Sequence, residues 1–126
     1  MQYSFKKLNL IVGWLSFVLA STVYLLTMEP TASFWDCSEF IATSYKLEVG
    51  HPPGAPLFMM ISRFFTMFGG PGQAAVLVNS MSALASGATV MFLFWTITHL
   101  ARRAMRKSGD ELTLPQTIAV LGAGLI

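Results

Sequence analysis

Two long apolar runs limit most strongly what this chain can fold into. The first extends from residue 8 to residue 28 and the second from residue 74 to residue 100. Each is long enough for a helix to cross a bilayer core, which takes about 20 apolar residues. Only 11% of the 126 residues are charged, against about 25% in ordinary soluble domains. The sequence therefore predicts an all-α, polytopic helical membrane protein.

The first run also resembles a cleaved signal peptide, with a passable cleavage site after Ala20. A retained span is favoured because the apolar sequence continues well beyond that site. A third apolar stretch begins at about residue 113 and is too short to cross comfortably before residue 126. We therefore expect residues 1–126 to be a single membrane module, an N-terminal fragment with two full spans and a truncated third.

The loop between the two runs, residues 29–72, is predicted to contain two short helices. The first covers about residues 34–47, where Ser33 and Asp36 have the spacing of a capping box with Ser33 as N-cap. Its polar face would carry Asp36, Glu39, Thr43 and Lys46. The second covers about residues 56–68, after a proline-rich turn. Both are too short to span, so we expect them at the membrane interface.

The charges predict the orientation of the chain. Of the eight Lys and Arg residues, all but Lys46 and Arg63 flank the two spans, at positions 6, 7, 102, 103, 106 and 107. Four of the six acidic residues lie between the spans. The positive-inside rule therefore places the N-terminus in the cytoplasm and residues 29–72 on the far side, the periplasm if the membrane is a bacterial inner membrane.

Several classes of function are disfavoured by composition. A net charge of +2, with the basic residues at helix ends, gives no sign of nucleic-acid binding. The single cysteine, Cys37, excludes an internal disulfide and a multi-cysteine metal site. His51 and His99 are far apart and no zinc-type spacing occurs, so the sequence predicts no metal ligands.

Two motifs in the loop carry a family resemblance. The run Trp35-Asp-Cys-Ser-Glu-Phe-Ile-Ala and the later run His51-Pro-Pro-Gly-Ala-Pro-Leu resemble the N-terminal signature of protein O-mannosyltransferase-like membrane proteins, the group that includes transmembrane protein 260. The resemblance covers residues 1 to about 110. Such proteins look like GT-C glycosyltransferases, so it implies a polyprenyl-phosphate-linked sugar as donor, a protein acceptor and chemistry on the non-cytoplasmic side of the lipid bilayer.

The residues fit that chemistry. A carboxylate can deprotonate the acceptor hydroxyl, and the resemblance places this base at Asp36, with Glu39 one turn on. Arg, Lys or a divalent cation can balance the phosphate charge, so Arg63 and His51 are candidates for binding the donor. Trp35 is a candidate for stacking on the sugar. No cofactor is firmly implied, and a divalent cation remains an option.

Each candidate also has a structural interpretation. Asp36 can close the capping box with Ser33, and Glu39 can be a solvated charge on an interfacial helix. His51 can be a turn residue, Arg63 can extend to lipid headgroups, and Trp35 can belong to an interfacial aromatic belt. The alternative to an enzyme is thus a non-catalytic membrane module, a transporter or assembly subunit, in which the loop only joins helices.

Overall fold

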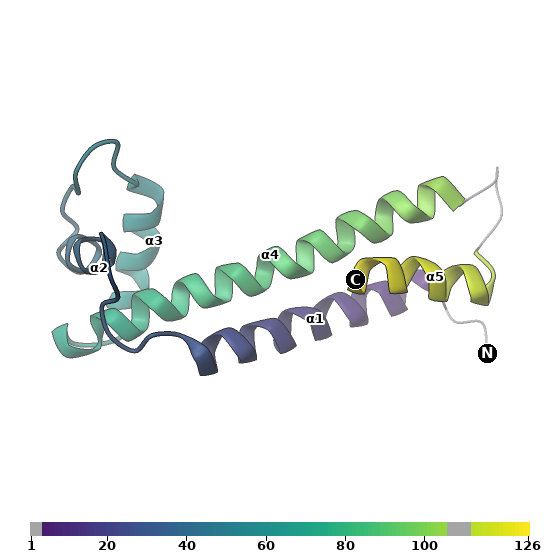
Figure 1. The fold of residues 1–126 in the computed structure, drawn as a ribbon, viewed down its shortest axis with the longest axis horizontal. Coiled ribbons are helices and arrows are strands. Elements are labelled where there is room, and N and C mark those ends of the chain that lie inside the picture. Colours follow the sequence, from purple (N-terminus) through teal and green to yellow (C-terminus); the bar gives the residue numbers. More distant parts are fainter. Residues whose placement is uncertain (1–3, 106–111) are drawn as a thin grey trace. The chain divides into compact units, whose positions relative to one another are not determined.

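The structure is a computed structural model that describes residues 4–105 and 112–126. Figure 1 shows that the regular elements in these residues are all helical, which confirms the all-α class. The α-helices are α1 (Phe5–Thr27), α2 (Cys37–Lys46), α3 (Pro56–Thr66), α4 (Ala74–Met105) and α5 (Leu114–Leu125), and a 3₁₀ turn (Pro71–Gln73) leads into α4. Arg106 and Lys107, two of the basic residues that predict the orientation of the chain, lie outside the described residues.

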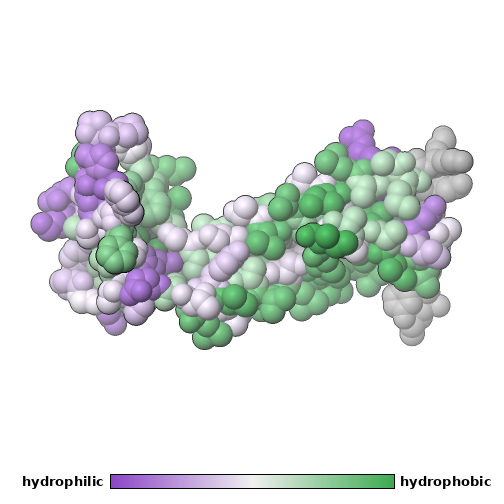
Figure 2. All heavy atoms as spheres, viewed as in Figure 1, coloured by the Kyte–Doolittle hydropathy of each residue, from purple (hydrophilic) through white to green (hydrophobic). Residues whose placement is uncertain are grey.

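The helices α1 and α4 are long and apolar enough to cross a membrane. They correspond to the two predicted spans, and α5 corresponds to the shorter third stretch. The large apolar side chains of α1 are mostly exposed, as Leu15 and Leu19 illustrate with 61% and 69% of their surfaces accessible. Figure 2 shows hydrophobic residues along α1 and α4 and hydrophilic residues around α2 and the loop that follows it.

One compact unit comprises the described residues of 1–22 and 86–126. Small residues allow its helices to approach closely. A Cβ at Gly87 would lie 2.1 Å from the Ser21 hydroxyl oxygen, and one at Gly13 would lie 2.1 Å from the Trp95 indole nitrogen. That nitrogen donates a hydrogen bond to the Asn9 carbonyl oxygen at 3.1 Å. Glycine at these two positions is therefore needed for the contact.

The second unit, Val23–Ala85, contains α2, α3 and the start of α4. Its buried core is formed by Ile41, Ala74 and Val78. The Asn79 amide donates hydrogen bonds to the carbonyl oxygens of Glu29 and Thr31, at 2.8 and 3.1 Å. These bonds fix the chain that leaves α1 against the first turns of α4. The segment that carries the sequence motifs is thus anchored at its beginning.

The predicted beginning of α2 is wrong by about three residues. Trp35 has a left-handed backbone (φ 63°), which interrupts the helix, so α2 begins at Cys37 and Asp36 occupies the N-cap position. Ser33 is therefore not the cap, and the Asp36 side chain makes no capping hydrogen bond. The structural interpretation of Asp36 as part of a capping box is consequently excluded.

The predicted polar face of α2 is wrong at Thr43, which is buried. Its hydroxyl donates to the Glu39 carbonyl oxygen at 2.7 Å and also contacts the Met59 sulfur at 3.2 Å. Ser44 is buried beside the same sulfur, at 3.3 Å. Small hydroxyl side chains thus let α3 pack closely on α2, and the solvated face of α2 is narrower than the sequence predicts.

The surface of α3 has the opposite polarity to that of a helix in a soluble protein. Ser62 and Thr66 are 0% and 1% exposed, whereas Leu57 and Phe64 are 71% and 59% exposed. The exposed apolar stripe comprises Leu57, Met60, Ile61, Phe64, Met67 and Phe68. A stripe of this size is unusual on a surface that faces water, which fits the expected interfacial placement.

Candidate functional site

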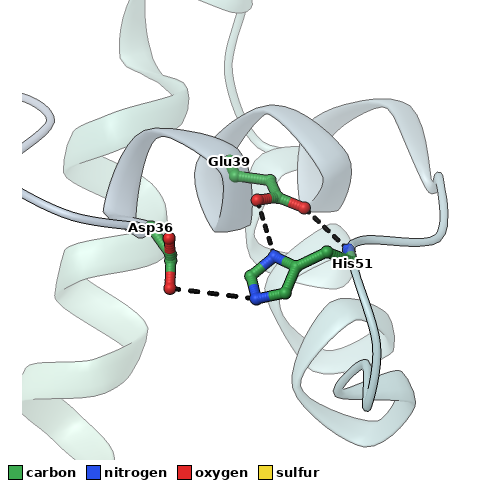
Figure 3. A group of neighbouring side chains, drawn as sticks. All are labelled: Asp36, Glu39 and His51. Atoms are coloured by element: carbon green, nitrogen blue, oxygen red, sulfur yellow. Dashed lines mark hydrogen bonds and ion pairs between the residues drawn. The ribbon is translucent and has the colours of Figure 1, made fainter.

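Three polar side chains meet near the N-terminus of α2. Asp36 precedes the helix, Glu39 lies in its first turn, and His51 comes from the loop after the helix (Figure 3). Each offers one oxygen or nitrogen atom, and these atoms all lie within 4.8 Å of one another. The structure therefore brings together three of the five candidate residues.

The end of α2 directs His51 back to the first turn. Leu47 adopts a left-handed backbone (φ 55°), and Glu48 N–H then bonds to the Thr43 carbonyl oxygen at 2.8 Å, so the chain reverses. Gly50 follows, where a Cβ would lie 3.2 Å from the Glu39 carboxylate. Glycine at this position allows the loop to approach Glu39 closely.

Glu39 holds His51 through both of its carboxylate oxygens. Oε1 accepts the backbone N–H of His51 at 2.8 Å, and Oε2 lies 2.8 Å from Nδ1 of the ring. A carboxylate only accepts hydrogen bonds, so Nδ1 carries the hydrogen in this contact. The interaction fixes the position and the orientation of the imidazole and leaves Nε2 as the outward-facing nitrogen.

That second nitrogen faces Asp36. The distance from Nε2 to Asp36 Oδ2 is 3.9 Å, too long for a hydrogen bond. The two side chains are 52% and 60% exposed, so solvent and ligands can reach the space between them. One oxygen atom, about 2.8 Å from each group, can bridge this distance.

The electrostatics of the pair favour its charged form. The hydrogen bond from the His51 backbone, and then the one from its ring, lower the pKa of Glu39. The hydrogen bond to Glu39 raises the pKa of His51, and the charges of Glu39 and Asp36 add to this effect. The imidazolium form of His51 is therefore favoured more here than in a free histidine.

Arg63 and Trp35 do not join the cluster. The half-buried guanidinium of Arg63 donates to the Tyr45 carbonyl oxygen and lies over the Tyr45 ring, 5.5 Å from its centroid. It therefore ties α3 to the C-terminal end of α2, where a cation is favourable. Trp35 and Phe34 project freely, with 93% and 91% of their surfaces exposed.

The sequence did not reveal two features of this region. One is the pairing of Glu39 with His51, because the two residues are 12 positions apart and no helical periodicity connects them. The other is an apolar groove of about 350 Å³ that reaches the site at Gly50. Its apolar lining comprises Leu47, Val49, Pro53, Ala55, Pro56, Met59 and Met60. Apolar residues on both sides of a proline-rich turn are its only signal in the sequence.

Comparison with known proteins supports the family resemblance. The family described as "Protein O-mannosyl-transferase TMEM260 N-terminal domain" matches residues 36–126, so the match begins at Asp36, extends beyond residue 110 and leaves out Trp35. The protein O-mannosyl-transferase TMEM260 of Mus musculus is 29% identical over 85 residues, and that of Dictyostelium discoideum is 27% identical over 94.

These alignments cover 68% and 73% of this chain. They cover 12% of each relative, so the chain spans about an eighth of the relatives' length. No solved structure matches the chain.

Proposed function

We propose that this chain, which belongs to the family of the protein O-mannosyl-transferase TMEM260 N-terminal domain, is the N-terminal part of a polyprenyl-phosphate-sugar-dependent O-glycosyltransferase. The observation that carries the proposal is the Asp36–Glu39–His51 cluster, whose residues lie along the sequence between two helices long enough to span a membrane. Both relatives named above are protein O-mannosyl-transferases, which makes mannose the first sugar to test and protein Ser or Thr the first acceptor.

Asp36 is the general base in this proposal. The acceptor hydroxyl oxygen forms a bond to the anomeric carbon of the sugar while the bond from that carbon to the phosphate oxygen breaks. The electron pair leaves with the lipid phosphate, and the hydroxyl proton passes to Asp36. The exposed Asp36 carboxylate makes no capping hydrogen bond, so it is available for this proton.

Glu39 and His51 act together on the donor side. Both carboxylate oxygens of Glu39 bind His51, so we assign Glu39 a positioning role rather than direct proton transfer. His51 then presents Nε2 to the donor phosphate or sugar beside Asp36. Arg63 remains a candidate for the phosphate, but its guanidinium would have to leave Tyr45. Trp35, exposed next to Asp36, remains a candidate for stacking on the sugar.

The site belongs on the non-cytoplasmic face of the membrane in this proposal, which in a bacterial inner membrane is the periplasmic face. The support is the distribution of charge, with basic residues outside the two spans and acidic residues between them. The exposed apolar stripe of α3 suits contact with the bilayer. A lipid-borne donor and a water-borne acceptor can both reach such a site.

Transfer in sealed vesicles tests the activity and the orientation together. The full-length protein is expressed in membranes that are prepared right-side-out or inside-out and supplied with labelled polyprenyl-phosphate mannose. A membrane-impermeant Ser/Thr peptide added outside should be labelled only by right-side-out vesicles. Labelling only by inside-out vesicles would reverse the orientation. Absence of labelling in both, and in detergent-opened vesicles, would favour the non-catalytic module, a transporter or assembly subunit.

A further inference from the structure

The space between Asp36 and His51 has the chemistry of a metal site. We propose that Asp36 Oδ2 and His51 Nε2 bind a divalent transition-metal cation such as Mn²⁺, with Glu39 orienting the histidine. The role of this cation in catalysis rests on the proposed function, because it would bind the phosphate of the donor. Its binding to the protein does not depend on that function.

The first argument is the orientation of the histidine. Histidine ligands of metals usually donate their second ring N–H to a carboxylate, which fixes the ring. Glu39 accepts the Nδ1 hydrogen of His51 in this way and also binds the backbone of the same residue. The ion binds the other nitrogen, Nε2, and displaces any proton there.

The second argument is distance. Two ligand atoms, each about 2.1 Å from an ion, are about 3.0 Å apart at right angles and about 4.2 Å apart on opposite sides. The observed separation of Nε2 and Oδ2 is 3.9 Å, within this range. An ion can therefore bind both atoms with side-chain adjustments alone, which the exposure of both residues permits.

The third argument is charge. Lys46 and Arg63 are the only Lys or Arg residues between positions 23 and 85. Lys46 pairs with Glu48 at 3.9 Å, and Arg63 binds Tyr45. A donor phosphate at the cluster would thus face two carboxylates and at most one imidazolium. A divalent cation cancels the charge of the two carboxylates and can bridge the protein to the phosphate.

The class of ion follows from the open site. Only two protein ligands are proposed, so water and phosphate oxygens must complete the coordination. Mg²⁺ is commonly bound through one or two carboxylates plus substrate phosphates, and Mn²⁺ has similar oxygen preferences. The imidazole nitrogen of His51 in the proposed site favours Mn²⁺ over Mg²⁺, which prefers oxygen ligands alone. Asp36 keeps Oδ1 for the acceptor proton, and a hydroxyl bound to the ion loses that proton more readily.

Mn²⁺ titration followed by electron paramagnetic resonance tests the proposal on purified full-length protein in nanodiscs, after removal of metal with a chelator. We expect one Mn²⁺ per chain, with imidazole nitrogen coupling in the pulsed spectrum. His51→Ala should abolish the coupling, and Asp36→Ala should weaken binding at least tenfold. Glu39→Ala should weaken it 10- to 100-fold. Glu48→Gln, which changes a nearby carboxylate outside the cluster, should leave binding unchanged.

Binding without nitrogen coupling, or coupling that persists in His51→Ala, would overturn the site, and so would an absence of binding by the wild-type protein. The nitrogen coupling is measured on the wild-type protein, so a poorly folded variant does not remove the test. Sugar transfer at the full rate in excess chelator would refute the role of the cation in catalysis and leave the proposed function standing. Mn²⁺ binding at His51 without any sugar transfer would support the cation site and refute the proposed function.

Discussion

Asp36→Asn is expected to lower the rate of sugar transfer by about 10²- to 10⁴-fold, the usual effect of removing a general base. The amide has nearly the same size as the carboxylate but cannot take the acceptor's proton. The change should not unfold the site, because Asn is as good an N-cap residue as Asp and the Asp36 side chain makes no capping hydrogen bond. Initial rates of full-length protein in membranes, corrected for expression level, measure the effect.

Ser33→Ala is the matched control for this substitution. Ser33 has the capping-box spacing in the sequence, but the helix begins four residues later, at Cys37. Its replacement should therefore leave transfer near the wild-type rate. The opposite pattern, with near-normal turnover in Asp36→Asn and a large loss in Ser33→Ala, would mean that the base lies elsewhere.

Glu39→Ala is expected to lower transfer by about 10- to 100-fold, the usual effect of losing the partner that orients a functional histidine. Without the carboxylate, His51 loses the acceptors for its backbone N–H and for Nδ1–H. Because His51 faces the donor in our account, the KM for the lipid-linked sugar should rise while the KM for the acceptor peptide stays unchanged. Steady-state kinetics with each substrate varied in turn give the two constants.

Two further variants separate positioning from general stability. Glu39→Gln retains one acceptor oxygen and should recover part of the activity, because it can hold either the backbone or the ring of His51 but not both. Glu48→Ala removes an exposed carboxylate of the same loop and should leave both KM values unchanged. If Glu39→Ala raised both KM values equally, or acted only by lowering the amount of folded protein, the positioning role would be wrong.

The parts of the fold that were predicted correctly depend on local sequence. The apolar runs were long enough to place α1 and α4, because a bilayer core sets a minimum length for a spanning helix. The position of α3 followed from an apolar segment that begins at Pro56 after a proline-rich turn. The all-α class followed from the same observations.

The errors arose where single residues adopt unusual backbone conformations or where distant segments meet. The left-handed backbone of Trp35 moves the start of α2 to a later residue, and no pattern in the sequence predicts this backbone conformation. The burial of Thr43 depends on Met59, which lies on another helix. Periodicity along α2 alone therefore predicted too wide a polar face.

The candidate site was predicted residue by residue but not as an arrangement. The motifs identified Asp36, Glu39 and His51, yet the hydrogen bonds between Glu39 and His51 require the chain reversal that begins at Leu47. For the same reason the sequence could not separate Arg63 from the cluster, since its partner Tyr45 lies at the far end of α2.

The most direct test of the account is a structure of the full-length protein with a non-hydrolysable polyprenyl-phosphonate sugar, determined in the presence of Mn²⁺. We predict the anomeric carbon within about 4 Å of the Asp36 carboxylate, and the phosphonate beside His51 Nε2 or an ion bound there. Donor density on a different part of the membrane domain, with Asp36, Glu39 and His51 facing only solvent, would contradict the claim that this cluster is the catalytic centre.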